Sequence, residues 1–164
     1  MSTATYEPHD RAERLAGAIY GTIVVAGILG ASDFDDHPEA FDTGLYALST
    51  VIVLWAAHAW AQTLGRRLVG GGRLGKALRH SLGRDWPLVQ SALPPLAAMA
   101  LAGVLGASDE TAISIGFWVC VAALCAWGAA IAHREHASAG RTVGTALVSG
   151  VLGLLLVALK ELVG

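Results

Sequence analysis

Charged residues are scarce in this chain of 164 residues: 15% are charged, 54% are hydrophobic, and the mean hydropathy is +0.55. A soluble domain of this length would need far more polar residues to cover its surface. The few charges are gathered in short blocks, and the apolar runs between them are long enough to cross a bilayer, which takes about 20 helical residues. The composition therefore excludes an ordinary soluble domain and predicts one all-α membrane domain.

A basic field and a disulfide are also missing. The net charge is −2, so no general positive surface points to nucleic acid as a partner. The two cysteines, Cys120 and Cys125, lie in one apolar run, and a separation of five residues places them about 140° apart around a helix. They cannot form a disulfide with each other. We interpret both as small, buried apolar side chains.

Five apolar runs follow a short N-terminal segment, residues 1–14. The runs cover residues 15–31, 44–64, 86–107, 112–132 and 143–163. The segment before the first run carries Glu7, Asp10 and Glu13 beside two arginines, which is a poor start for a signal peptide, so we expect the first run to be retained as a span. The predicted fold is five transmembrane helices in a membrane domain covering residues 15–164.

The loops between the runs are asymmetric in charge. Residues 32–43 hold five acidic residues and no basic one, and the turn at 108–111 adds Asp109 and Glu110. Ten of the eleven basic residues lie on the other side, with Lys160 as the exception. The positive-inside rule then predicts that the N-terminus is cytoplasmic and that the C-terminus lies outside.

The longer basic loop has an amphipathic pattern at about 73–82. Leu74, Ala77, Leu78 and Leu82 share one face of a possible helix, while basic residues occupy the other face. This pattern predicts a short helix lying on the inner leaflet. The alternative is an ordinary basic loop that serves only to set the topology.

One octapeptide occurs twice. Residues 26–33 recur as residues 102–109 with seven of eight positions identical, and both copies lie where a span reaches the acidic side. The repeat predicts a duplicated two-helix hairpin in parallel orientation, followed by a fifth helix. Chance similarity between Ala/Gly/Leu-rich segments is the alternative.

Small residues recur at a spacing that suits close helix packing. Gly17 and Gly21 form such a pair in the first run, and the fifth run holds two overlapping pairs, Ala146 with Gly150 and Ser149 with Gly153. Such pairs let two helix backbones approach closely. They serve packing within one chain or between subunits.

Polar residues inside spans are the main candidates for a functional site, because they are costly there. The candidate layer consists of Tyr20 and Thr22 in the first run, Trp55, His58 and Gln62 in the second, and Gln90, Ser91, Pro94 and Pro95 in the third. At a rise of about 1.5 Å per residue these groups lie at similar depth. The prolines remove the donors that would bond the carbonyls of Gln90 and Ser91.

This layer has two interpretations. Freed carbonyls beside a histidine could hold waters or a small cation, or relay a proton, since the reference pKa of histidine is near neutrality. Alternatively, a neutral His58 donates to one of those carbonyls and ties the second span to the third, and the proline pair marks only a packing kink.

Other chemistry finds less support. His133 and His136 could hold a metal only if a third ligand approached, so a solvated turn is the preferred interpretation. The acidic residues at 33–36 lack the glycine turn and distal glutamate of a calcium loop. We therefore predict no catalytic residues, no metal site and no cofactor, and a haem pair is disfavoured because one histidine alone, His58, lies well inside the membrane.

Three segments carry a family resemblance: Ile-Tyr-Gly-Thr at 19–22, Trp-Ala-Ala-His at 55–58 and Ala-Leu-Pro-Pro at 92–95. They resemble a family of small bacterial integral membrane proteins without assigned activity, which implies an inner-membrane location. Arg14 with Trp55 and His58 is also similar to the layout of TMEM-type potassium channels. Their Phe-Ser-Asp element is absent, since residues 15–19 read Leu-Ala-Gly-Ala-Ile, so channel function is not carried over.

The leading hypothesis is a small oligomeric channel or transporter for a proton or small cation, with His58, Tyr20, Gln90 and Ser91 at the constriction. The second is a non-catalytic membrane scaffold or partner-binding subunit, and a membrane enzyme ranks third. The expected partners are the lipid bilayer, further copies of the chain and the proton or cation itself.

Overall fold

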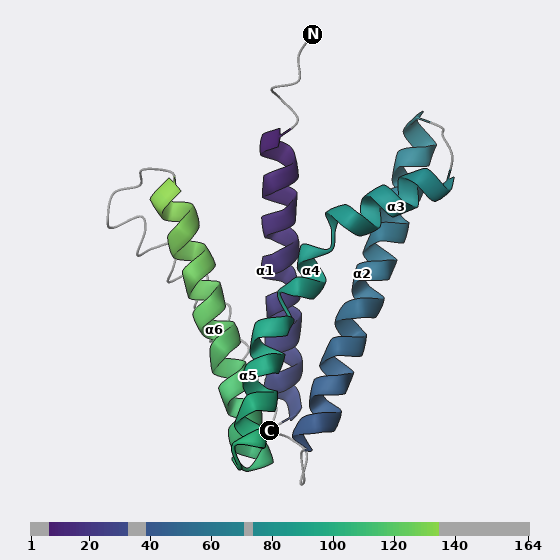
Figure 1. Ribbon diagram of the computed structural model, residues 1–164. Coiled ribbons are helices and arrows are strands. Elements are labelled where there is room, and N and C mark those ends of the chain that lie inside the picture. The colour runs from purple at the N-terminus through teal and green to yellow at the C-terminus, as the bar shows by residue number, and fades with distance from the viewer. Residues whose placement is uncertain (1–6, 33–38, 71–73, 135–164) are drawn as a thin grey trace.

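Figure 1 shows the computed structural model, which describes residues 7–32, 39–70 and 74–134. These residues form helices and no strand, so the all-α prediction is confirmed for them. The helices are α1 (Glu7–Ala31), α2 (Ala40–Gly70), α3 (Leu74–Arg84), α4 (Pro87–Gln90), α5 (Leu93–Val104) and α6 (Asp109–Arg134). The predicted fifth run, residues 143–163, lies outside the described residues.

Three of these helices are long and apolar enough to cross a membrane. Their apolar stretches are Arg14–Ala31 in α1, Ala40–Gly65 in α2 and Asp109–Ala130 in α6. A fourth crossing results if Leu74–Gln90 and Leu93–Val104, which meet at a bend of 40°, count as one broken span. The expected third run, 86–107, is thus divided between α4 and α5, and the helices are compatible with a membrane location.

The three long helices spread apart, with α2 and α6 running opposite to α1 (Figure 1). α1 runs down the centre in Figure 1, while α2 and α6 begin at the lower end and diverge from α1 as they rise. α4 packs against α1, α5 against α6, and α3 against the end of α2. The broken pair α4–α5 therefore lies between the long helices.

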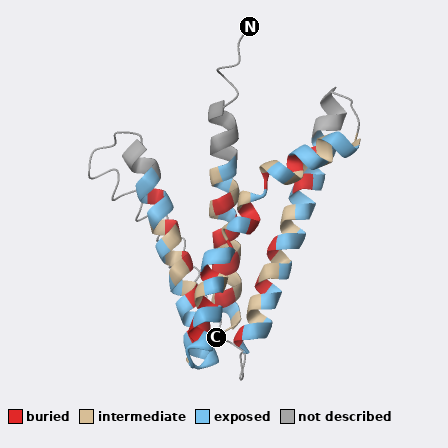
Figure 2. Cartoon of the chain, viewed as in Figure 1, coloured by how far each residue is buried: buried red, intermediate tan, exposed pale blue. Residues whose placement is uncertain are grey.

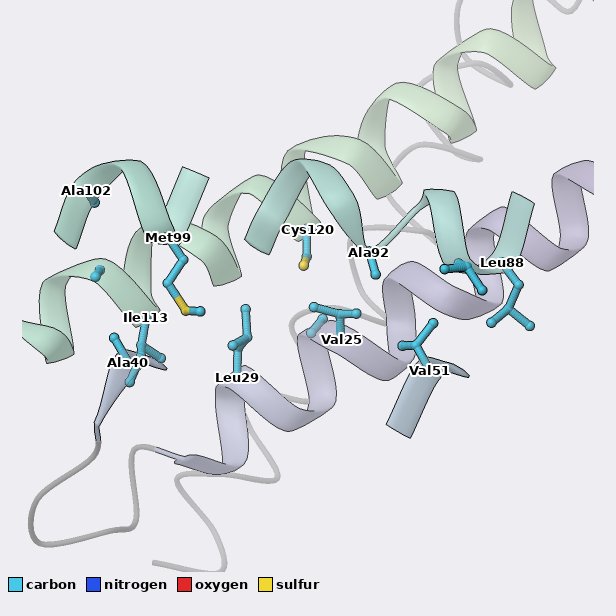
Figure 3. Packing of buried hydrophobic residues seen from close by; sticks show 13 residues of the cluster. Val25, Leu29, Ala40, Val51, Leu88, Ala92, Met99, Ala102, Ile113 and Cys120 are labelled. Carbon is cyan, nitrogen blue, oxygen red and sulfur yellow. The ribbon is translucent and has the colours of Figure 1, made fainter. Parts of the chain in front are cut away.

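The core follows the line where α1, α5 and α6 meet. Val25, Leu29, Met99, Ile113 and Cys120 are buried there and pack together (Figure 3). Lipid tails are as apolar as these side chains, so shape complementarity and dispersion rather than removal from water hold such helices together. Much of the outside of the helices is exposed (Figure 2). Large apolar residues such as Trp118, which is 61% exposed, are among these exposed residues, which suits contact with lipid.

The glycine pair of α1 packs within the chain. A Cβ built at Gly17 would lie 3.9 Å from the Cβ of Leu88 in α4. A Cβ at Gly21 would collide with the carbonyl oxygen of Leu88 and with Oγ of Ser91. The predicted small-residue motif thus lets α1 approach the backbone of α4 more closely than any larger residue would allow.

A capped turn joins α5 to α6. Gly106 has φ of +88°, and the amides of Gly106 and Ala107 donate to the carbonyls of Gly103 and Ala102, each at 3.0 Å. This is the Schellman pattern, which favours glycine at the left-handed position. Ser108 then caps α6, because its Oγ accepts from the amide of Thr111 at 3.4 Å.

The two copies of the octapeptide end their helices differently. Gly106 of the second copy terminates α5, whereas its counterpart Gly30 remains inside α1, which continues to Ala31. A Cβ at Gly30 would lie 3.5 Å from the ring of Phe117 in α6. Equal sequences therefore take different local conformations here, because their tertiary neighbours differ.

The amphipathic pattern at 73–82 corresponds to α3. α3 packs against α2. One of its faces is half-buried, namely Leu74, Ala77, Leu78 and Leu82, while Lys76 and Arg79 are exposed. The helix itself is therefore present as expected. Its position on the inner leaflet stays a prediction.

Candidate functional site

The broken pair α4–α5 forms the centre of the candidate site. α4 ends at Gln90, α5 begins at Leu93, and Pro94 and Pro95 occupy the first turn of α5. A proline has no amide hydrogen, so the carbonyls of Gln90 and Ser91 cannot accept the hydrogen bonds that an unbroken helix would supply. The break thus leaves two backbone acceptors without their usual helical donors.

A groove of about 500 Å³ opens beside this break. It is bounded by α1 and α6, and its floor is formed by α4 and the start of α5. The lining residues are Ala18 and Thr22 of α1, Pro87, Gln90, Ser91 and Pro94 at the break, and Ala123, Ala126, Trp127 and Ala130 of α6. Four of the nine predicted layer residues, namely Thr22, Gln90, Ser91 and Pro94, therefore come together.

The hydroxyl groups in the groove already have partners in their own helices. Thr22 Oγ1 donates to the carbonyl of Ala18 at 2.9 Å, and Ser91 Oγ donates to the carbonyl of Leu88 at 2.8 Å. Each hydroxyl oxygen keeps lone pairs that can accept a further bond. Gln90 is exposed and adds an amide with two donors and an acceptor. The groove thus combines oxygen acceptors with mostly small, apolar walls.

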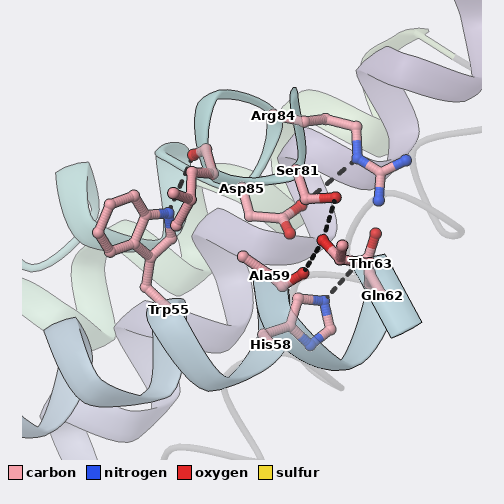
Figure 4. A network of polar contacts seen from close by, with 9 residues as sticks. Trp55, His58, Ala59, Gln62, Thr63, Ser81, Arg84 and Asp85 are labelled. Carbon is pink, nitrogen blue, oxygen red and sulfur yellow. Dashed lines mark hydrogen bonds and ion pairs between the residues drawn. The ribbon is translucent and has the colours of Figure 1, made fainter. Parts of the chain in front are cut away.

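His58 and Gln62 lie elsewhere, on an exposed face of α2. Nε2 of Gln62 and Nε2 of His58 are 2.8 Å apart, one turn from each other (Figure 4). Tyr20 is 50% exposed on α1 and does not line the groove. These three residues of the predicted layer therefore do not join Gln90 and Thr22 in the groove.

Trp55 belongs to a third environment, the junction of α2 with α3. Its Nε1 donates to the carbonyl of Leu82 at 3.1 Å, and its ring meets that of Trp86 edge to face at 5.4 Å between centroids. Pro95 is buried, and its carbonyl would lie 3.2 Å from a Cβ at Gly116. Both residues therefore serve packing in the described part of the chain.

The junction also contains polar residues that sequence reasoning missed. Asp85 is 8% exposed, and its Oδ1 lies 3.5 Å from Nε of Arg84 (Figure 4). Nearby, Thr63 Oγ1 donates to the carbonyl of Ala59 at 2.7 Å and lies 3.4 Å from Ser81 Oγ. One signal was available: Asp85 is the single acidic residue in the basic segment 65–85.

The remaining chemistry is limited. No group of three metal-ligating His, Cys, Asp or Glu side chains occurs among the described residues. A second groove, of about 540 Å³, lies between α2 and α5 and is walled by apolar side chains such as Phe41, Leu45 and Met99, with Asp109 at its edge. Of the two grooves, the one beside the helix break is the one lined by several polar side chains, Thr22, Gln90 and Ser91.

Comparison with known proteins gives no further assignment. No protein family, curated protein or solved structure matches this chain.

Proposed function

We propose that this chain is a multi-pass bacterial inner-membrane protein that moves a proton or a small cation across the bilayer. The observation that carries the proposal is the helix break at Gln90 to Ala92, which opens onto the groove beside Thr22. Backbone carbonyls freed from a helix inside a membrane need protein donors, water or an ion. Broken helices with such carbonyls coordinate cations in transporters.

The oxygen atoms at the break match the preference of hard cations. The carbonyls of Gln90 and Ser91, the amide oxygen of Gln90 and the hydroxyl of Thr22 are neutral oxygen ligands, as in filters that replace a hydration shell. The ring of Trp127 at the groove adds an aromatic face that attracts cations. The same acceptors can order a chain of waters for a proton.

The wider architecture is part of this proposal. Residues 143–163 form the fifth span, the two copies of the octapeptide descend from a duplicated hairpin, and the basic ends of the helices face the cytoplasm. A polar pair inside a span is costly when it faces lipid. His58 is exposed on α2, where it contacts the half-buried Gln62, and this supports association of several copies through α2, with His58 as a proton carrier at the contact.

Flux measurements in liposomes test the proposal. Gln90→Leu removes the amide at the break, and we expect it to lower proton or potassium flux about tenfold, since one lost hydrogen bond to a charged species costs about 1.5 kcal/mol or more. Ser91→Ala and Thr22→Val should act in the same direction. Ser114→Ala is the matched control, because Ser114 is exposed on α6 and does not line the groove.

The outcomes separate the site from the function. Wild-type flux equal to that of empty liposomes refutes transport. If all three groove variants keep the wild-type flux, the transport pathway does not pass through the helix break. If His58→Gln and His58→Ala alone lower the flux, the pathway follows α2 instead.

A second candidate function is a non-catalytic membrane scaffold or partner-binding subunit. It is favoured by the division of the polar layer, since His58 and Tyr20 are exposed and do not line the groove with Gln90. Disulfide trapping through Ala57→Cys, next to His58 on α2, would reveal a contact between copies. Trapped oligomers without flux in liposomes would support this second candidate.

A further inference from the structure

The groove beside the helix break has the shape of a site for another helix. Its α6 wall holds a stripe of three small residues at a spacing of three and four, Ala123, Ala126 and Ala130, beside one large residue, Trp127. α1 contributes Ala18 on the opposite wall. Small side chains on both walls allow the backbone of an added helix to come close. Figure 1 shows that α6 diverges from α1 toward its end at Arg134. The groove is lined by residues of both helices.

The polar floor of the groove needs a cover in a membrane. Gln90 is exposed in the described residues, and the carbonyls of Gln90 and Ser91 have lost their helical donors. Contact of such groups with hydrocarbon is unfavourable. The alanines of the groove therefore surround polar groups, and a neighbouring helix can shield these groups better than lipid can.

The chain holds one apolar segment of matching chemistry outside the described residues, 143–163. At about 1.5 Å per residue its 21 residues would form a helix of roughly 32 Å. It follows α6 after only eight residues, 135–142, and short connections of this kind join antiparallel neighbours. Its small residues, Ala146, Ser149, Gly150 and Gly153, repeat the spacing of the α6 stripe.

We propose that residues 143–163 occupy this groove as a helix antiparallel to α6. A hairpin centred near residue 138 pairs Ala130 with Ala146, Ala126 with Gly150 and Ala123 with Gly153. Both stripes cover eight residues, about 10 Å of helix from first to last, so they match in length. Ser149 then lies beside the break and supplies a hydroxyl to its carbonyls. This assignment concerns packing and does not depend on transport.

Disulfide trapping tests the register in the full-length protein. In a Cys120→Ala, Cys125→Ala background, the pair Ala126→Cys with Gly150→Cys should oxidise in membranes to an intrachain disulfide, which requires Cα atoms within about 7 Å. Peptide mapping by mass spectrometry identifies the link. The matched control replaces Ala126 by Ala129, which lies about one turn farther along α6, is exposed and does not line the groove. It should stay reduced.

Two results would overturn the proposal. A dimer on non-reducing gels would assign the groove to a second copy of the chain. If neither the test pair nor the control pair oxidises, the groove is assigned to lipid. The pair Ala130→Cys with Ala146→Cys repeats the test at a second level of the groove. Circular dichroism detects a folding defect in either double variant, and the other variant then decides the outcome.

Discussion

The contact of Gly21 with α4 gives the sharpest prediction. Gly21→Ala adds a methyl group that would collide with the backbone carbonyl of Leu88 and with Ser91 Oγ. Overpacking of this kind costs about 1–3 kcal/mol, whereas the gain in helix propensity from glycine to alanine is about 1 kcal/mol. Because a backbone carbonyl cannot rotate away as a side chain can, we expect the cost to prevail by about 1–2 kcal/mol.

The assay is reversible unfolding in lipid–detergent micelles, followed by tryptophan fluorescence and far-ultraviolet circular dichroism. Gly27→Ala is the matched control in the same helix, since none of the described atoms lies within 4 Å of a Cβ built there. It should leave the stability unchanged or raise it by up to about 1 kcal/mol. Both substitutions raise helix propensity equally, so their difference isolates the contact with α4.

A double variant separates the two colliding atoms. Ser91→Ala in the Gly21→Ala background removes Oγ but leaves the carbonyl of Leu88 in place, so it should restore only part of the lost stability. Gly21→Ala with wild-type or higher stability would refute the close approach of α1 to α4. Full recovery in the double variant would show that the backbone is not the obstacle.

The α2–α3 junction yields two further predictions. Trp55→Phe keeps the aromatic packing but removes the donor to the carbonyl of Leu82; we expect a loss of about 1 kcal/mol in unfolding free energy and faster amide exchange in α3, and unchanged exchange would contradict this role. Asp85→Asn replaces the carboxylate next to Arg84 at a largely buried site and should cost about 1–3 kcal/mol, measured by the same unfolding assay. Asp109→Asn, at an exposed position, serves as its control and should change stability by less than about 0.5 kcal/mol.

Much of the helical layout could be predicted from hydropathy, because a long apolar run without charges has few stable alternatives to a helix. Residues 15–31, 44–64 and 112–132 fall inside α1, α2 and α6. The proline pair indicated lost helical hydrogen bonds or a kink in the third run, since proline removes a helical hydrogen bond, but not the division of that run into α4 and α5. The number of spans in the whole chain and their orientation stay predictions.

For the candidate site, the sequence predicts the depth of each side chain along its helix but not the direction in which that side chain points. Counting residues along a helix gives the level of Thr22, His58 and Gln90, because the rise per residue is constant. Which face of a helix points inward depends on its neighbours, and lipid accepts the apolar residues of any face. Thr22 is buried at 1% exposed while His58 is exposed, a distinction that no count along the chain contains.

The sequence by itself determined the scarcity of charge, the apolar runs and the separation of acidic from basic loops, since these are properties of local composition. Tertiary structure alone decided that Gly21 meets α4, that Gly106 ends a helix while its counterpart Gly30 does not, and that Thr22 joins Gln90 in one groove. The physical reason is close packing. Because glycine has no Cβ, two helix backbones can come into contact there, and this contact fixes how each helix is rotated about its own axis. The rotation then determines which polar side chains meet.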